Sequence, residues 1–156
     1  MWNSERQIQE SFFTYVREYS ILYPKFATIF AIPNGGRREK IDAILMRRGG
    51  VLSGVWDVQV PYPSSNSRNT KMWIEFKYGK NKLTDNQILF KDNLSRISPN
   101  DIWCVYYNPI LAFNELCIYS GIDIKIEDNN GEINNIRRSS KRRSNGVKYP
   151  SRYSSW

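Results

Sequence analysis

Two carboxylates and an ammonium group stand in neighbouring segments of this chain, and their types and spacing suit metal-assisted chemistry. Asp57 lies in residues 54–61 (GVWDVQVP), and Glu75 and Lys77 lie in residues 71–77 (KMWIEFK). Both segments alternate and are rich in Val, Ile and aromatic residues, which predicts two strands. The Pro61–Thr70 segment between them contains two prolines and a Ser/Asn cluster, which predicts a hairpin loop.

This hairpin is expected to bring the two acids together. Folding it about the loop midpoint places Asp57 within one residue of Glu75, and Glu75 and Lys77 share a face because side chains alternate along a strand. The apolar neighbours are expected on the other face: Trp56, Val58, Ile74 and Phe76. Like charges facing each other on paired strands destabilise the pair, so a hard divalent cation is a natural partner. The alternative is a surface Lys–Glu contact with Asp57 pointing elsewhere.

The composition excludes several classes of enzyme. The chain contains no histidine, which removes Ser–His and Cys–His catalysis, His-based zinc sites and histidine-dependent nucleases. A hydrolase built from this sequence would use carboxylates, lysine and a metal ion. Neither a P-loop nor a dinucleotide glycine fingerprint is present. Cys104 and Cys117 lie in apolar segments, which predicts buried free thiols rather than a disulfide or a metal pair.

Length and hydropathy predict one folded domain inside the cell. The 156 residues are 40% hydrophobic and 14% aromatic, enough to form a core rather than a disordered chain. No apolar run reaches about 18 residues, so we expect no membrane span. The first ten residues have no apolar signal core, so we expect a cytoplasmic protein.

The positive charge is concentrated at the C-terminal end. The net charge is +8, yet residues 137–156 hold 7 of the 23 basic residues and no acid, which leaves 16 basic against 15 acidic residues before them. Such a basic tail is typical of binding to a polyanion, most often nucleic acid. We therefore divide the chain into a folded domain, residues 1–127, and a basic, flexible tail, residues 128–156.

The remaining patterns predict alternating helices and strands. A helix begins at Asn3 or Ser4 and carries a core-facing stripe to about Tyr19. The further elements are a buried strand at 26–32, a helix at 39–48 that ends at Gly49 and Gly50, the hairpin, a helix that begins with a Thr84–Gln87 capping box, a strand at 101–107, a helix from Pro109 to about Tyr119 closed by Gly121, and a short strand at 122–127. The fold class is α/β, with a mixed central sheet flanked by helices.

Three further features have both a functional and a plain interpretation. Asn34, Gly35 and Gly36 permit positive φ and close backbone approach to a ligand, and Arg37 and Arg38 suit phosphate, but the segment also fits a simple turn before a helix. The plain interpretation of Glu10, at the margin of the first helix's stripe, is a solvated helix residue. The plain interpretation of Gln87 is a capping partner, and the functional roles of both follow from the resemblance below.

Together these residues resemble a known nuclease pattern. Asp57 followed by Glu75-Phe76-Lys77 matches the D…E-x-K signature of the PD-(D/E)XK superfamily. A helix glutamate (Glu10), PNGGR (33–37), GxxD (54–57), IEFK (74–77), a basic loop and LTxxQ (83–87) follow in the order and spacing of VRR-NUC domains, the virus-type replication-repair nucleases. The resemblance covers residues 4–120. That family often has proline before the aspartate, where this chain has Trp56.

The resemblance implies a restriction-endonuclease-like core and a Mg²⁺- or Mn²⁺-dependent phosphodiesterase that acts on DNA. Short stand-alone forms resemble phage and bacterial homodimeric enzymes that cut branched DNA such as Holliday junctions, and larger relatives process flaps. In this interpretation Asp57, Glu75 and the Phe76 carbonyl hold the metal, and Glu10 reaches a first or second metal through water. Lys77 orients the nucleophile, and Gln87 positions Lys77 or the water. DNA-backbone contacts are assigned to Asn34, Gly35, Gly36, Arg37, Arg38, Lys80 and Lys82.

Two other functions stay open at this stage. A non-catalytic nucleic-acid-binding module that keeps the nuclease fold would also account for the basic tail and the aromatic content. A restriction-type enzyme that reads a base sequence would need a recognition element, and none is obvious in this single short domain.

Overall fold

A mixed four-stranded sheet forms the centre of the molecule. The computed structural model describes residues 2–33, 46 and 48–127. The strands lie in the order β1 (Phe30–Ala31), β2 (Val58–Val60), β3 (Met72–Phe76) and β4 (Ile102–Tyr106). β1 and β2 pair antiparallel, as do β2 and β3, whereas β4 runs parallel to β3. The expected α/β class with a mixed, helix-flanked sheet is confirmed.

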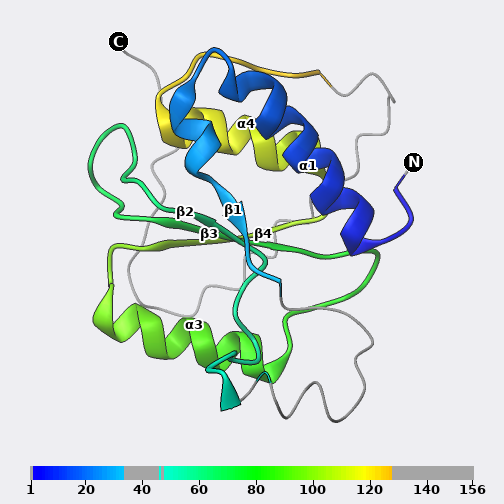
Figure 1. The fold of residues 1–156 in the computed structure, drawn as a ribbon, viewed down its shortest axis with the longest axis vertical. Helices are drawn as coiled ribbons and strands as arrows, with labels where there is room; N and C mark the ends of the chain where they lie inside the picture. Colours follow the sequence, from blue (N-terminus) through cyan, green and yellow to red (C-terminus); the bar gives the residue numbers. More distant parts are fainter. Residues whose placement is uncertain (1, 34–45, 47, 128–156) are drawn as a thin grey trace.

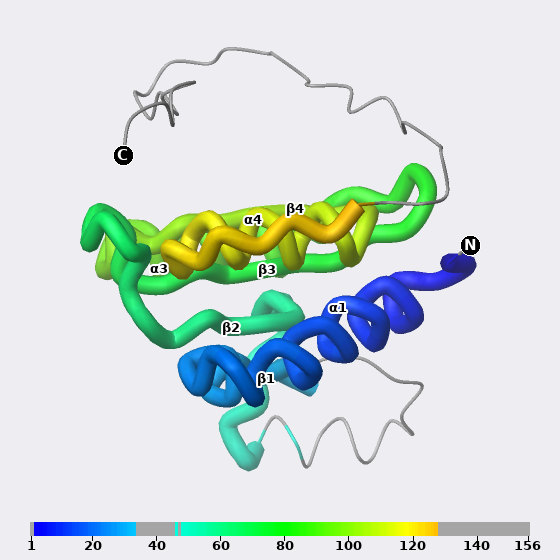
Figure 2. Tube along the Cα trace, turned by 90° about the horizontal axis from the view of Figure 1, so that it is seen from above, coloured from blue at the N-terminus to red at the C-terminus, as the bar shows by residue number. Residues whose placement is uncertain are grey.

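Helices cover the two faces unequally. α1 (Glu5–Ser20) and α4 (Pro109–Ser120) lie on one face, and α3 (Asp85–Ile97) lies on the other (Figure 1). Seen from above, α4 lies over β3 and β4, and α1 runs beside it towards β1 (Figure 2). The Phe113 ring of α4 packs 5.1 Å from Tyr19 of α1, centroid to centroid, which joins the two helices into one layer.

The predicted helix signals are present at the helix ends. Ser4 caps α1 and accepts from the Gln7 amide, and the predicted stripe is buried at Ile8, Phe12 and Val16. The Thr84–Gln87 capping box begins α3. α4 has Pro109 in its first turn and ends at Gly121, whose φ of 68° is left-handed. These local signals are confirmed because each depends only on residues a few positions apart.

The core lies between the sheet and the α1–α4 layer. Met72, Ile74 and Phe76 of β3 join it, and the Phe76 ring lies 5.3 Å from that of Phe12. The alternate β3 residues point the other way, and Trp73 contacts Phe90 of α3 with centroids 5.7 Å apart. β3 is therefore buried on both faces, apolar towards α1 and α4 and mixed towards α3.

The predicted strand at 26–32 is mostly wrong. Pro24–Thr28 forms a 3₁₀ helix, η1, and only Phe30–Ala31 is a strand, with both residues exposed. Phe26 and Ile29 are buried. Residues three apart lie on the same side of a 3₁₀ turn, whereas a strand would place them on opposite faces. The helical conformation therefore buries both side chains.

The predicted strand at 122–127 is also wrong, because this segment is not a strand. The Asn114 side chain of α4 donates to the Ile126 carbonyl at 2.9 Å and accepts from the Ile126 amide at 2.8 Å. These two bonds satisfy the backbone groups that a neighbouring strand would otherwise have paired.

Several sequence predictions concern residues outside the described ranges. They include the Asn34–Arg38 turn, most of the 39–48 helix and the 128–156 tail. Met46 and Arg48 are helical, and residues 49–50 form the turn predicted to end that helix. Both cysteines are free as predicted, Cys117 buried and Cys104 half-buried. In the described part of the chain, no helix combines the length and apolar character needed to cross a bilayer.

Candidate active site

Asp57 and Glu75 meet at one end of the β2–β3 hairpin. The ladder pairs Val58 with Ile74, so its next step sets Asp57 opposite Glu75. The Asp57 amide donates to Glu75 Oε2 at 3.2 Å, and the Phe76 amide donates to Asp57 Oδ2 at 2.9 Å. Each acid is thus held by the backbone of the opposite segment. The structure sets Asp57 directly opposite Glu75, which agrees with the expected register to within one residue.

Lys77 joins this pair from the same strand. Its Nζ lies 2.7 Å from Glu75 Oε1, and Glu75 and Lys77 are only 1% and 5% exposed. The alternative of a surface Lys–Glu contact is therefore wrong. The two residues share the α3 face, as alternation along β3 predicts.

Gln87 combines the two roles that its position allowed. Its Oε1 accepts from the Thr84 amide at 2.9 Å, which completes the capping box. Its Nε2 donates to Glu75 Oε1, the oxygen that Lys77 also contacts. The first turn of α3 therefore orients Glu75, and Gln87 acts on the acid rather than on Lys77.

Residues 54–56 dock the Asp57 segment on α3. Gly54 has a φ of 83°, and a Cβ at this position would lie 2.4 Å from the Asn86 carbonyl carbon. Trp56 donates from Nε1 to the Gln87 carbonyl at 3.2 Å and packs edge-on against Trp103. Glycine is required here because no side chain fits between the segment and the helix.

The expected orientation of Trp56 is wrong. Val58 belongs to the core beneath α1 and α4, whereas Trp56 lies against α3 with Trp103. The reason is that β2 begins only at Val58, so the alternation of a strand does not extend back to Trp56. Trp103 in turn stacks on Trp73, with rings 5.2 Å apart and 7° from parallel. An aromatic cluster therefore lies beside the acids.

Burial raises the pKa of both acids. For Asp57 the loss of solvation is the largest effect, opposed by the hydrogen bond from Phe76 and the charge of Lys77. For Glu75 burial also comes first and the charge of Asp57 second, while Lys77 and Gln87 act in the opposite direction. One lysine does not compensate two buried carboxylates, so a further cation would stabilise the ionised pair.

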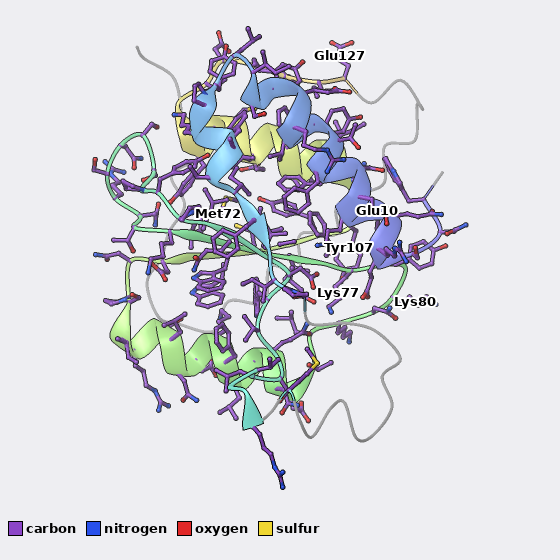
Figure 3. All side chains as sticks on the ribbon, viewed as in Figure 1. Glu10, Met72, Lys77, Lys80, Tyr107 and Glu127 are labelled. Carbon is purple, nitrogen blue, oxygen red and sulfur yellow. The ribbon has the colours of Figure 1, made fainter. Side chains whose placement is uncertain are left out.

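Glu10 does not lie with these acids. Its carboxylate accepts from Arg6 Nε at 2.7 Å, its side chain is 58% exposed, and it lines an open cleft of about 440 Å³ beside α1 together with Phe13 and Arg17. Figure 3 shows Glu10 on α1. The contact with Arg6, one helical turn earlier, accounts for Glu10 as a solvated helix residue.

Glu5 is the α1 acid that contacts the loop beside the site, and the sequence did not assign it to the site. Burial is the main cause that raises the pKa of Asp57, and the charge of Glu5 is a smaller cause in the same direction. Its Oε1 accepts from Asn81 Nδ2 at 2.9 Å, which ties it to the loop after β3. The resemblance assigned Glu10 instead, because no local pattern reports how α1 is oriented towards the hairpin.

The loop after β3 carries the two lysines assigned to DNA. Lys80 and Lys82 are exposed, and Tyr107 Oη donates to the carbonyl of Asn81 between them at 2.7 Å. Lys77, Tyr107 and Lys80 lie at the same end of the sheet in Figure 3. The other assigned residues, Asn34, Gly35, Gly36, Arg37 and Arg38, lie outside the described ranges.

Within the described residues, no group of three or more Asp, Glu, His or Cys side chains is placed to hold a metal ion. Asp57 and Glu75 form a pair, and any further ligand would have to be another oxygen, such as the Phe76 carbonyl. Comparisons with models of known families, with curated proteins and with solved structures find no match for this chain. The site is therefore interpreted from its geometry.

Proposed function

We propose that this chain is a metal-dependent endonuclease with a PD-(D/E)XK core, similar to VRR-NUC domains, that hydrolyses phosphodiester bonds in branched DNA. The observation that carries the proposal is the contact of Asp57, Glu75 and Lys77 at the end of the β2–β3 hairpin. The spacing of these three residues matches the D…E-x-K signature, and their positions on paired segments support one shared site.

The residues present fit a hard divalent cation such as Mg²⁺ or Mn²⁺. Asp57 and Glu75 offer only oxygen, burial raises the pKa of both, and the charge of Asp57 raises that of Glu75 further. The Phe76 carbonyl adds a backbone oxygen next to Glu75 on the same strand. Bound there, the ion would lower the pKa of a water molecule and offset negative charge on the phosphate. In the described part of the chain, Asp57 Oδ1 has no hydrogen-bond partner, which leaves it open to a ligand.

The chain's own groups would then bind and orient the substrate. Lys77 Nζ would hold the attacking water and stabilise charge that develops on the phosphate, while its contact with Glu75 fixes its position. Gln87 keeps Glu75 in one orientation. Glu5, rather than Glu10, is the helix glutamate that we place near the metal, because it is bonded to Asn81 in the loop after β3, whereas Glu10 pairs with exposed Arg6.

The charge distribution supports a DNA partner. Exposed Lys80 and Lys82 follow the site directly, and the basic residues of 137–156 add sequence-independent attraction to phosphates. Arg37 and Arg38 are assigned to the same role from sequence. A homodimer would supply the two sites that symmetric cutting of a branch point requires. Light scattering of the purified chain tests this expectation.

The experiment that tests the proposal is a cleavage panel of four-way junctions, flaps, duplex and single strands with Mg²⁺ or Mn²⁺. Asp57→Asn should lower the cleavage rate more than about 100-fold, because even residues that only support metal ligands cost 10- to 100-fold. Asp92→Asn is the matched control, since Asp92 is an exposed α3 carboxylate. Native-rate cleavage by Asp57→Asn would refute the assigned site, and a wild-type chain that cuts no substrate would refute the enzyme.

A non-catalytic DNA-binding module is the second candidate, and one observation favours it. Both Glu75 oxygens already accept hydrogen bonds, from Asp57, Lys77 and Gln87, so the acid is satisfied without a metal. Calorimetric titration with Mn²⁺ separates the candidates. Heat of binding that disappears in Asp57→Asn supports the nuclease, whereas the absence of binding heat together with the absence of cleavage supports the module.

A further inference from the structure

Tyr107 is an exposed aromatic residue at the edge of the candidate site. β4 pairs in parallel with β3, with Tyr106 beside Phe76, and the Lys77 amide donates to the Tyr106 carbonyl at 2.9 Å. Tyr107 follows β4 directly, so its backbone lies next to that of Lys77. The side chain of Lys77 is buried, whereas Tyr107 is 47% exposed. Part of an aromatic ring thus faces solvent next to the proposed reacting groups (Figure 3).

Hydrogen bonds hold this ring in place. Tyr107 Oη donates to the Asn81 carbonyl at 2.7 Å, and Asn81 Nδ2 donates to Glu5 Oε1 at 2.9 Å. The Asn81 amide also donates to the Tyr78 carbonyl at 3.1 Å, which closes a turn in the loop. An exposed side chain that is already fixed loses little conformational freedom when a ligand stacks on it.

Cationic residues flank the ring on the same loop. Lys80 and Lys82 stand on either side of Asn81, and both are exposed. Aromatic surface beside backbone-binding cations is the combination with which proteins hold single-stranded nucleic acid. A base inside an intact duplex is already stacked on both faces and cannot use such a ring.

We propose that Tyr107 stacks on an unpaired base of the DNA substrate, so that the bond to be cut lies next to a single-stranded nucleotide. The inference rests on the proposed nuclease function and refines its substrate class. It favours flaps and branches with single-stranded arms over fully paired junctions. Tyr107 is then the residue that recognises the branch, while Lys80 and Lys82 hold the backbone.

Binding measured without metal tests this proposal separately from cleavage. Fluorescence anisotropy of the full chain in EDTA compares a flapped duplex with the same duplex lacking the flap. Tyr107→Leu should weaken flap binding by about 5- to 100-fold, because base–aromatic stacking contributes about 1–3 kcal/mol. Duplex binding should stay within about twofold. Tyr107→Phe keeps the ring, loses only the bond to Asn81 that holds it, and should retain most of the flap affinity.

A second readout and a control complete the test. A 2-aminopurine base in the flap should be quenched by the native chain and by Tyr107→Phe, but not by Tyr107→Leu. Phe30→Leu removes a similarly exposed residue, 44% exposed, from β1 at the opposite edge of the sheet and should change neither signal.

A Tyr107→Leu chain that binds the flap as the native chain does, or loses flap and duplex binding equally, overturns the proposal. So does a Tyr107→Phe chain as weak as Tyr107→Leu. Because no metal is present, a chain that never cuts DNA can still give the expected result, so failure of the nuclease and failure of the stacking are distinguishable.

Discussion

The two faces of the sheet are covered by helices of very different character. α4 buries eight of its residues against the sheet and α1, including Phe113 and Leu116. α3, which is described along its whole length, has no buried residue. It contacts the opposite face mainly through Phe90 and the side chain of Gln87. The first face is an apolar core, and the second carries aromatic and charged side chains.

The difference indicates where this fold can keep charge. An ionised side chain beneath α1 and α4 would lose its water and find no partner, at a cost of several kcal/mol. On the α3 face, Glu75 and Lys77 satisfy each other, and the capping amide of Gln87 adds a third contact. β3 alternates between the faces, so one strand contributes both to the core and to the site.

Removing the ammonium group of Lys77 should disturb the α3 face most severely. Lys77→Met leaves Glu75 buried without an ionic partner, and breaking such a pair typically costs about 3–5 kcal/mol of unfolding free energy. The pKa of Glu75, already raised by burial, should rise further. Urea unfolding at neutral pH measures the loss. Lys91→Met, at a half-exposed α3 lysine, is the control and should cost less than about 0.5 kcal/mol.

The loss of unfolding free energy in Lys77→Met should depend on pH. A carboxyl group with a raised pKa binds more protons in the folded than in the unfolded chain, so the unfolding free energy falls as pH rises above the ordinary values, 3.8 for Asp57 and 4.5 for Glu75. In Lys77→Met the pKa of Glu75 is expected to be higher still, so the unfolding free energy continues to fall to higher pH. The destabilisation should therefore be smallest in acid and grow towards neutral pH. A loss that is constant with pH would mean that Lys77 contributes packing rather than charge.

A matched pair of helix truncations tests whether the two faces differ in stability as they do in burial. Leu116→Ala on α4 removes a side chain that is 0% exposed and should cost about 2–5 kcal/mol. Leu89→Ala on α3 removes one that is 59% exposed and should change the unfolding free energy by less than about 0.5 kcal/mol. Urea denaturation of both variants measures the contrast. Equal losses would show that α3 contributes as much to stability as α4, which would contradict the difference between the two faces.

Sequence prediction succeeded where a signal is local and failed where orientation decides. The Thr84–Gln87 capping box, the Gly121 stop and the meeting of Asp57 with Glu75 depend on near neighbours or on one hairpin. The apolar run at 26–32 did not reveal its 3₁₀ turn, because continuous hydrophobicity carries no period. The sequence singled out Glu10 and not Glu5, because no spacing within the helix encodes how α1 meets the loop after β3.

A substitution at Gly54 tests how the segment that carries Asp57 packs against α3. Gly54→Ala and Gly50→Ala both place a side chain at positive φ, 83° and 89°, which costs about 1–2 kcal/mol in either case. At Gly50 the added Cβ meets nothing within 4 Å, whereas at Gly54 it meets the Asn86 backbone at 2.4 Å. The difference between the two unfolding free energies therefore isolates the contact between the Asp57 segment and α3. We expect Gly54→Ala to be the less stable variant in urea and to bind Mn²⁺ more weakly in calorimetry, since the shifted segment carries Asp57. Equal stability and equal Mn²⁺ affinity of the two variants would mean that α3 does not position the aspartate, and that the α3 face holds its charges through β3 alone.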